Sequence, residues 1–484
     1  MVKLDGCTIF ARVASFTHNL LVLSDVHLGS DLVHHAQPDA PQRARASERR
    51  KRDLIGFLDY YRTHPQGGRS WRLVIAGDFI DFVGMSVLPE AHYETEPTAE
   101  ELMHGLGGAW DHALAKLRLL MRHEADVMTS LARFIAAGNS LVIVRGNHDV
   151  EWHWEAVQQA FRDELVTLAR FAPEQLEFLP WFYYEEGRIF IEHGHQYDAY
   201  CSFEHVLNPV SPADPRRTVR SLSDVLLRYI VRPTRGMTEA GHAAAGMLDY
   251  LRFAAKLGVR GMFTLARRFA ASTWALILLW REHLSDAALR IQNEQEQRLR
   301  ALGRAQKIQA DKLMALVRLQ RPPITKSLFA IFASVMLDRV LLGLIGVLAC
   351  LTIWLWAPSG LHAVASTALV VAALSTIGFL WRRLRDSLEP SAELRERSAL
   401  VARLFPAALV VMGHTHLPEK HAASETTTYV NLGAWAEDDV EEGHRPNLPA
   451  TRTHLVVAET EDKPLAELYT WRDEGPTVFR PETT

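Results

Sequence analysis

Cysteine is scarce in this chain of 484 residues, which has only three. They lie far apart, at Cys7, Cys201 and Cys350, so they predict no disulfide framework and permit a reducing compartment. Internal repeats and low-complexity tracts are also lacking, which argues against repeat architectures. A signal peptide is not expected, because residues 1–16 mix charged with apolar residues and lead directly into an apolar run.

Five short polar fragments stand out, and each follows an apolar run typical of a buried β-strand. The fragments are Ser24-Asp25-Val26-His27, Gly77-Asp78-Phe79-Ile80-Asp81, Gly146-Asn147-His148-Asp149, Glu192-His193-Gly194-His195 and Gly413-His414-Thr415-His416. The preceding runs are 20–23, 73–76, 141–145, 188–191 and 408–412. Polar side chains at the ends of buried strands converge on one sheet edge, so the fragments predict a single site.

The side chains in these fragments indicate a site for divalent metal ions. They are Asp, His and Asn without cysteine, a set that suits Mn²⁺, Fe²⁺, Zn²⁺ or Ni²⁺ and does not choose among them. Two ions roughly 3.5–4 Å apart can clamp the oxygens of a phosphoryl group and lower the pKa of a water between them. One aspartate must then bind both ions, and Asp78 is the natural candidate.

In type and order, the fragments resemble the motifs of the calcineurin-like metallophosphoesterase superfamily, D-x-H, G-D-x-x-D, G-N-H-[DE], a lone His and G-H-x-H. The resemblance implies a four-layer α/β/β/α sandwich and two divalent metal ions. The implied ligands are Asp25, His27, Asp78 and His416 for the first metal, and Asp78, Asn147, His193 and His414 for the second. Any one fragment could be an ordinary turn, but five in order favour this interpretation over a relative that has lost its metals.

The resemblance also implies roles for two residues outside the ligand set. His148 is expected to protonate the leaving oxygen or to stabilise the phosphoryl transition state, with Asp81 holding its ring. Asp81 is followed by Phe82-Val83 rather than by the Arg-Gly of the protein phosphatases, which disfavours a phosphoprotein substrate. His195 and Asp198 are not required by the motif. We expect them either to hydrogen-bond to metal ligands without binding a metal themselves or to be merely structural.

The chain is too long for one such domain, which predicts a large insertion. About 200 residues separate His193 from His414, although both must reach the same metal. We therefore expect a catalytic domain in two parts, 1–200 and 401–484, with a helical insertion over 201–400.

The first half of the insertion is basic. Residues 211–330 contain 21 Lys and Arg against 9 Asp and Glu, although the whole chain has a net charge of −4. Basic helices are expected over 211–326: the segment 247–280 either lies in a membrane interface or packs on the catalytic domain, and the segment 281–320 could form an arm or a homodimer contact. A membrane surface explains the charge better than nucleic acid does, because of the segments that follow.

Two apolar segments follow, and their lengths fit a membrane-spanning hairpin. Residues 340–357 carry no charge and residues 361–381 carry only a histidine, so as helices they would span about 27 and 31 Å. The turn Pro358-Ser359-Gly360 permits only a tight connection. Arginines flank both outer ends, at 339, 382, 383 and 385, which predicts entry and exit on the cytoplasmic side. A buried helical hairpin in a soluble dimer is the alternative.

The sequence leaves three functions open. The stretches 23–28 and 77–82 are similar to those of the UDP-2,3-diacylglucosamine pyrophosphatase branch, which implies a hydrolase of a lipid-linked phosphodiester or pyrophosphate at the cytoplasmic face of a membrane. The same enzyme could instead act on a soluble nucleotide or phosphodiester, with the hairpin only as an anchor. A membrane scaffold with a structural metal site is the third reading, and His148 argues against it because a structural site needs no leaving-group acid.

Overall fold

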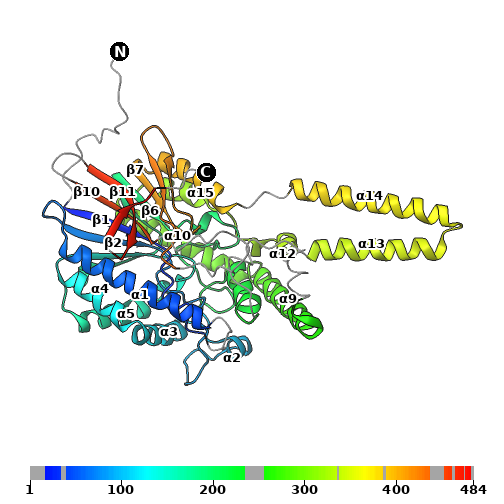
Figure 1. The fold of residues 1–484 in the computed structure, drawn as a ribbon, viewed down its shortest axis with the longest axis horizontal. Coiled ribbons are helices and arrows are strands. Elements are labelled where there is room, and N and C mark those ends of the chain that lie inside the picture. Colours follow the sequence, from blue (N-terminus) through cyan, green and yellow to red (C-terminus); the bar gives the residue numbers. More distant parts are fainter. Residues whose placement is uncertain are drawn as a thin grey trace, which may run out of the picture.

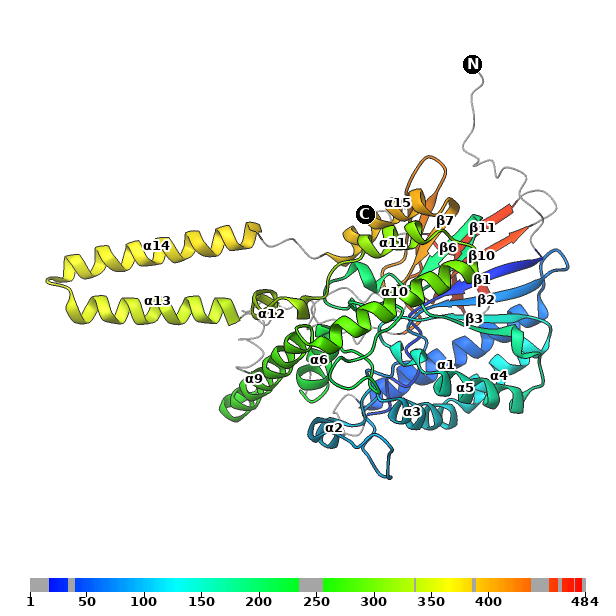
Figure 2. The ribbon, with the colours of Figure 1, turned by 180° about the vertical axis from the view of Figure 1, so that it is seen from behind.

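Two stacked β-sheets form the centre of the molecule, and helices cover their outer faces (Figures 1 and 2). The computed structural model describes residues 17–33, 40–234, 256–334, 337–384, 389–436, 452–459, 464–473 and 475–480. The expectation for residues 1–16 lies outside the described residues.

The first sheet has seven strands in the order β12-β11-β10-β1-β2-β3-β4. The strands are β1 (His18–Leu23), β2 (Ser70–Ala76), β3 (Ser140–Val144), β4 (Leu176–Leu179), β10 (Thr453–Glu459), β11 (Pro464–Arg472) and β12 (Gly475–Val478). Strands β1 to β4 are parallel, whereas β10 pairs with β1 in the antiparallel sense. Residues from the end of the chain therefore complete the sheet that the first residues begin.

The second sheet has five strands in the order β5-β6-β7-β9-β8. They are β5 (Phe182–Glu185), β6 (Gly187–Glu192), β7 (Ala407–Met412), β8 (Glu419–Ala422) and β9 (Thr428–Asn431). Strand β7 pairs in parallel with β6, so residues on either side of the long insertion are neighbours here as well. The domain boundaries at residues 200 and 400 remain a prediction.

Alternating side chains of the strands build three apolar layers. In β1, Leu21 and Leu23 pack toward the helices of the first sheet, whereas Leu20 and Val22 pack between the two sheets. In the second sheet, Ile191 faces the first sheet and Phe190 faces the helices beyond. This period of two in buried strands produces the helix, sheet, sheet, helix layering, and a mixed α/β fold with two sheets fits the architecture that the motifs implied.

The helices on the outer face of the first sheet include one difference from the sequence prediction. They are α1 (Ala40–Thr63), α3 (Trp110–His123), α4 (Ala125–Ala136) and α5 (Glu155–Leu168), with α2 (Ala99–His104) beside them. The sequence pattern over 109–137 predicts a single helix, but the chain breaks at Glu124, where φ is −104° and ψ is 28°. The buried Glu124 carboxylate lies 3.6 Å from the Lys51 ammonium, and this tertiary contact outweighs the local helical pattern.

The insertion contributes two groups of helices. Helix α6 (Leu222–Leu226), the π-helix η4 (Leu227–Val231), α9 (Gly258–Glu282) and α12 (Leu328–Ser334) share an apolar core. Helices α10 (Asp286–Gln306) and α11 (Ala310–Leu319) pack with α15 (Pro390–Leu404) over the second sheet. The segment 281–320 is thus two packed helices rather than an arm, because Lys307 adopts a left-handed φ of 55° and ends α10. The homodimer expected from this segment remains a prediction.

The two apolar segments form helices α13 (Leu337–Trp356) and α14 (Gly360–Leu384). They lie side by side and extend away from the body of the molecule, as Figures 1 and 2 show. Their outward side chains are strongly exposed, for example Trp356 at 83% and Leu361 at 80%. By length and composition, Gly258–Glu282 of α9 and Gly360–Phe379 of α14 could each cross a membrane, whereas the apolar part of α13, Leu342–Trp356, is shorter. Two such helices are weak evidence for a membrane association.

Candidate active site

The loops after β1, β2, β3, β6 and β7 meet at one end of the stacked sheets. Short backbone hydrogen bonds join them: His27 N donates to the Asp78 carbonyl oxygen (2.9 Å), and Gly413 N donates to the His193 carbonyl oxygen (3.0 Å). The Asp78 carboxylate accepts from His148 N at 2.9 Å. The structure therefore brings together side chains from all five fragments.

The backbone is strained at five of the residues that the sequence predicts as metal ligands. Five non-glycine residues of this site have a left-handed φ between 50° and 71°: Asp25, His27, Asp78, His414 and His416. Each such residue costs about 1–3 kcal/mol, and strain of this kind persists where the surroundings enforce it, most often at functional sites. The strain thus falls on the residues that the motifs identify.

Glycines in the motifs leave room for the ligand side chains. A Cβ at Gly146 would lie 2.0 Å from the Asp78 Oδ1, and a Cβ at Gly77, whose φ is 87°, would lie 2.5 Å from the His193 ring. Any larger residue would displace these side chains. The glycines of G-D-x-x-D and G-N-H-D are therefore explained by close approach.

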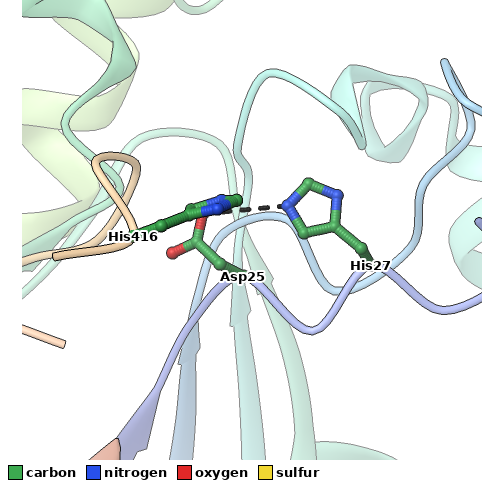
Figure 3. A group of neighbouring side chains, drawn as sticks. All are labelled: Asp25, His27 and His416. Carbon is green, nitrogen blue, oxygen red and sulfur yellow. Dashed lines mark ion pairs between the residues drawn. The ribbon is translucent and has the colours of Figure 1, made fainter. Parts of the chain in front are cut away.

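Asp25, His27 and His416 form the first group of ligand atoms. The Asp25 Oδ1 lies 3.2 Å from His416 Nε2 and 3.9 Å from His27 Nε2, and Figure 3 shows the three side chains close together. Asp25 Oδ1 and His27 Nε2 are buried and have no hydrogen-bond partner among the described residues. Because buried polar atoms are normally paired, this convergence fits a cation between them.

Asp78, Asn147 and His193 form the second group. His193 Nδ1 lies 2.9 Å from the Ala76 carbonyl oxygen, which can only accept, so Nδ1 carries the proton and Nε2 faces the site. That Nε2 lies 3.0 Å from Asn147 Oδ1 and 3.2 Å from Asp78 Oδ2. Asp78 Oδ2 also lies 3.7 Å from His27 Nε2, so one carboxylate oxygen contacts both groups.

His414 is held from two sides. Its backbone N donates to Asp25 Oδ2 (3.1 Å), and its ring Nε2 donates to Asp198 Oδ2 (3.0 Å). Nδ1 is then the nitrogen left for a metal, and Asp198 is the residue that fixes this orientation. His195 is buried, and its Nδ1 has no hydrogen-bond partner among the described residues. Burial lowers the pKa of His195 far below the ordinary range, so its ring is neutral. This ring packs against the His193 ring.

His148 and Asp81 lie beside the first group. His148 Nδ1 donates to Asp81 Oδ1 at 2.8 Å, and its ring packs edge-on against His27 with centroids 4.6 Å apart. The other oxygen of Asp81 lies 3.1 Å from the guanidinium of Arg232, which comes from the insertion. No sequence motif pointed to Arg232, because its partner is distant in the chain.

The comparison with protein families agrees with this geometry. Residues 18–235 match the calcineurin-like phosphoesterase family. The matched residues include the first four fragments, whereas the G-H-x-H fragment at 413–416 lies beyond them. The match and the groups of ligand atoms support the metallophosphoesterase superfamily and a metal-dependent phosphoester hydrolase. No curated protein matches the chain.

The charges of this site suit divalent ions. Burial alone would raise the pKa of Asp25 and Asp78, but neighbouring histidines, His193 foremost, hold both pKa values far below the ordinary range. Burial alone would lower the pKa of His193, yet Asp78 and Asp25 raise it to about 9. The carboxylates are thus ionised at neutral pH, which is the form that binds metal ions.

Proposed function

We propose that the chain is a two-metal phosphoesterase that hydrolyses a phosphodiester or a pyrophosphate. The ion sites would be formed by Asp25, His27, Asp78 and His416, and by Asp78, Asn147, His193 and His414. The observation that carries this proposal is Asp78 Oδ2, which lies within 4 Å of a ring nitrogen in each group. When bound, the ions would supply a nucleophile from water and neutralise the charge of the phosphoryl group.

In this proposal the chain itself assists bond cleavage through His148. Because Nδ1 donates to Asp81, Nε2 is the nitrogen that can serve the leaving group. The cationic ring gives its proton to the departing oxygen, and the buried Asp81 carboxylate stabilises the ring charge before that transfer. The neighbouring His27 ring limits how far His148 can turn.

We further propose that the substrate is linked to a lipid and that the site faces the cytoplasm. The exposed apolar surface of α13 and α14 supports this proposal, since it has no covering partner among the described residues. The arginines that flank both outer ends of the hairpin favour the cytoplasmic side. The short similarity to the UDP-2,3-diacylglucosamine pyrophosphatase branch favours a pyrophosphate.

Helix α9 offers a second contact with the same membrane. Its first half exposes Val259 and Phe263 beside Arg260, and it points toward the side from which the hairpin extends in both views (Figures 1 and 2). Apolar residues next to basic ones suit the interface of an anionic membrane. Its second half packs on α6 and η4, so the helix connects that surface to the phosphoesterase body.

A panel of substrates tests the proposed function. The full chain is purified in detergent, loaded with Mn²⁺, Fe²⁺, Zn²⁺ or Ni²⁺, and assayed on a chromogenic diester, a nucleotide pyrophosphate and a lipid-linked pyrophosphate in mixed micelles. We expect metal-dependent turnover with the highest kcat/KM on the lipid, and Asp78→Ala serves as the inactive control. Equal kcat/KM on the soluble substrates would favour an anchored soluble-substrate enzyme. No turnover on any substrate would favour the scaffold.

A further inference from the structure

One arginine of the insertion reaches into the catalytic body. Arg232 follows the π-helix η4, and its Nη2 lies 3.1 Å from Asp81 Oδ2. Its Nη1 donates to the Ser30 carbonyl oxygen at 3.1 Å, in the loop that carries His27. One side chain thus connects the insertion to both the His148–Asp81 pair and the first metal loop.

The two oxygens of Asp81 have separate partners. Oδ1 accepts from His148 Nδ1 at 2.8 Å and from Gly84 N at 2.7 Å, whereas Oδ2 faces Arg232. A carboxylate that is held on both oxygens cannot rotate freely about its Cβ–Cγ bond. Arg232 therefore restricts the direction from which Asp81 can hold the His148 ring.

The space around this contact is kept open by a glycine. A Cβ at Gly84 would lie 1.9 Å from Asp81 Oδ2 and 2.2 Å from Arg232 Nη2. No other residue could stand there without separating the two groups, and the φ of Gly84 is not in the left-handed region. The glycine is thus explained by the Asp81–Arg232 contact rather than by its backbone conformation.

The helix that presents Arg232 is largely buried and of an unusual type. Arg232 N donates to the Leu227 carbonyl oxygen at 2.9 Å, the five-residue spacing of a π-helix. Leu227, Ile230 and Val231 are buried in the core that η4 shares with α9. π-helical turns are rare and frequently occur at functional sites.

We propose that Arg232 is a positioning residue for the leaving-group acid. It holds Oδ2 of Asp81 so that Oδ1 keeps His148 Nδ1 engaged and His148 Nε2 directed at the departing oxygen. This inference rests on the proposed function and adds that the insertion, not only the phosphoesterase domain, completes the catalytic apparatus.

Arg228 provides a matched control. It lies four residues earlier in η4 and pairs with Glu100 at 2.7 Å and with the Gly105 carbonyl oxygen, so it joins the insertion to the same domain without contacting Asp81 in the described structure. Arg228→Ala should therefore disturb the docking of η4 about as much as Arg232→Ala while leaving the Asp81 carboxylate held.

Turnover on diesters with good and poor leaving groups tests the proposal. Arg232→Ala should keep its metal content and its KM but lose about 10- to 100-fold in kcat on the poor leaving group, and less on the good one. Arg232→Lys should recover part of the loss, and Arg228→Ala should stay close to wild type. In the His148→Ala background, Arg232→Ala should cause no further loss, because the group it positions is gone.

A second readout does not depend on activity. In protein labelled with ¹⁵N-histidine and observed at a pH where the His148 ring is neutral, that ring, assigned by its absence in His148→Ala, should keep its one remaining proton on Nδ1 in the wild type. In Arg232→Ala it should become a mixture of tautomers. An unchanged tautomer, or an equal kcat loss with and without His148, would overturn the role of Arg232. If the metal-loaded wild type turned over no substrate, the proposed function would fail, and the ring-nitrogen spectra would still decide whether Arg232 positions His148.

Discussion

At the scale of single residues, the site overrides local backbone preferences. Asp25, His27 and Asp78 all have a left-handed φ, which residues other than glycine rarely adopt, and asparagine and aspartate adopt it most easily. The surrounding loops enforce this conformation by accepting or donating hydrogen bonds across the five fragments. Sequence motifs can identify such residues, but they cannot show that the backbone is strained there.

A substitution at His148 separates acid catalysis from metal binding. His148→Ala should retain its metal ions and lose on the order of 10²–10⁴ in turnover, with the greater loss on poor leaving groups, because only those need a proton at departure. Asp81→Asn should change turnover in the same direction but less. Kinetics on a series of diesters, with metal analysis of the same samples, measures both effects. Wild-type turnover of His148→Ala on an unactivated diester would contradict the role.

The residues that meet at this site were predictable from the sequence, whereas the contacts that hold them in place were not. Asp78 and His193 lie in ordered motifs after apolar runs, and these patterns are visible without a structure. Asp198 contacts His414, which lies 216 residues away in the chain. Arg232 contacts Asp81, which lies 151 residues away. No local pattern encodes such a pairing, so the sequence could only leave Asp198 open and could not identify Arg232.

At the scale of elements, the structure differs from the sequence prediction mainly where helices are interrupted. The helical pattern of the sequence continues through Glu124 and Lys307, and by itself it predicts one helix in each region. In the structure Ile308 N donates to the Gly303 carbonyl oxygen (2.9 Å) beside a left-handed Lys307, a C-terminal motif that glycine usually supplies. Without glycine at that position, the end of α10 gave no signal in the sequence.

An ion-pair cluster within the insertion gives a prediction about acid stability. Glu204 Oε2 accepts from His283 Nδ1 at 2.8 Å, at the end of α9, and Glu204 Oε1 accepts from Lys326 Nζ at 2.6 Å. Burial alone would raise the pKa of Glu204, but His283 and Lys326 lower it to about 2. A carboxyl group with a lowered pKa stabilises the fold above its ordinary value of about 4.5, and this contribution is lost as the pH falls toward 2.

Glu204→Gln should therefore destabilise the chain by about 2 kcal/mol near neutral pH and by less than half of that near pH 3, because the contribution is lost only as the pH falls toward 2. Thermal denaturation of wild type and variant between about pH 6 and pH 3 measures the difference. A difference in midpoint that does not shrink as the pH falls would show that Glu204 acts by packing and not by its charge.

At the scale of the whole molecule, two sheets are completed by residues from both sides of the insertion. Strands β1 and β10, and β6 and β7, are neighbours in space although most of the chain or the insertion lies between them. The return of the chain to the catalytic sheets after the insertion was predictable, because His193 and His414 were expected to reach the same metal. The packing of α10 and α11 over the second sheet was not, since their polar pattern also suits an arm.

The apolar hairpin gives the prediction for the whole chain. If α13 and α14 span a bilayer, the protein should stay in the membrane fraction after carbonate and high salt, which remove proteins held only by surface charge. Deleting residues 340–381 should release it with the metal site intact, and should reduce activity on a lipid substrate far more than on a small diester. A full chain that is soluble without detergent would contradict the membrane proposal.

The central claim is that one carboxylate, Asp78, holds two metal ions in a hydrolytic site. Metal content and diester turnover, measured on the same preparations of wild type, Asp78→Ala and His416→Ala, test this claim most directly. The wild type should bind two ions and be active, His416→Ala should lose mainly one ion, and Asp78→Ala should lose both ions and its activity. Retention of both ions or of turnover in Asp78→Ala would contradict the claim.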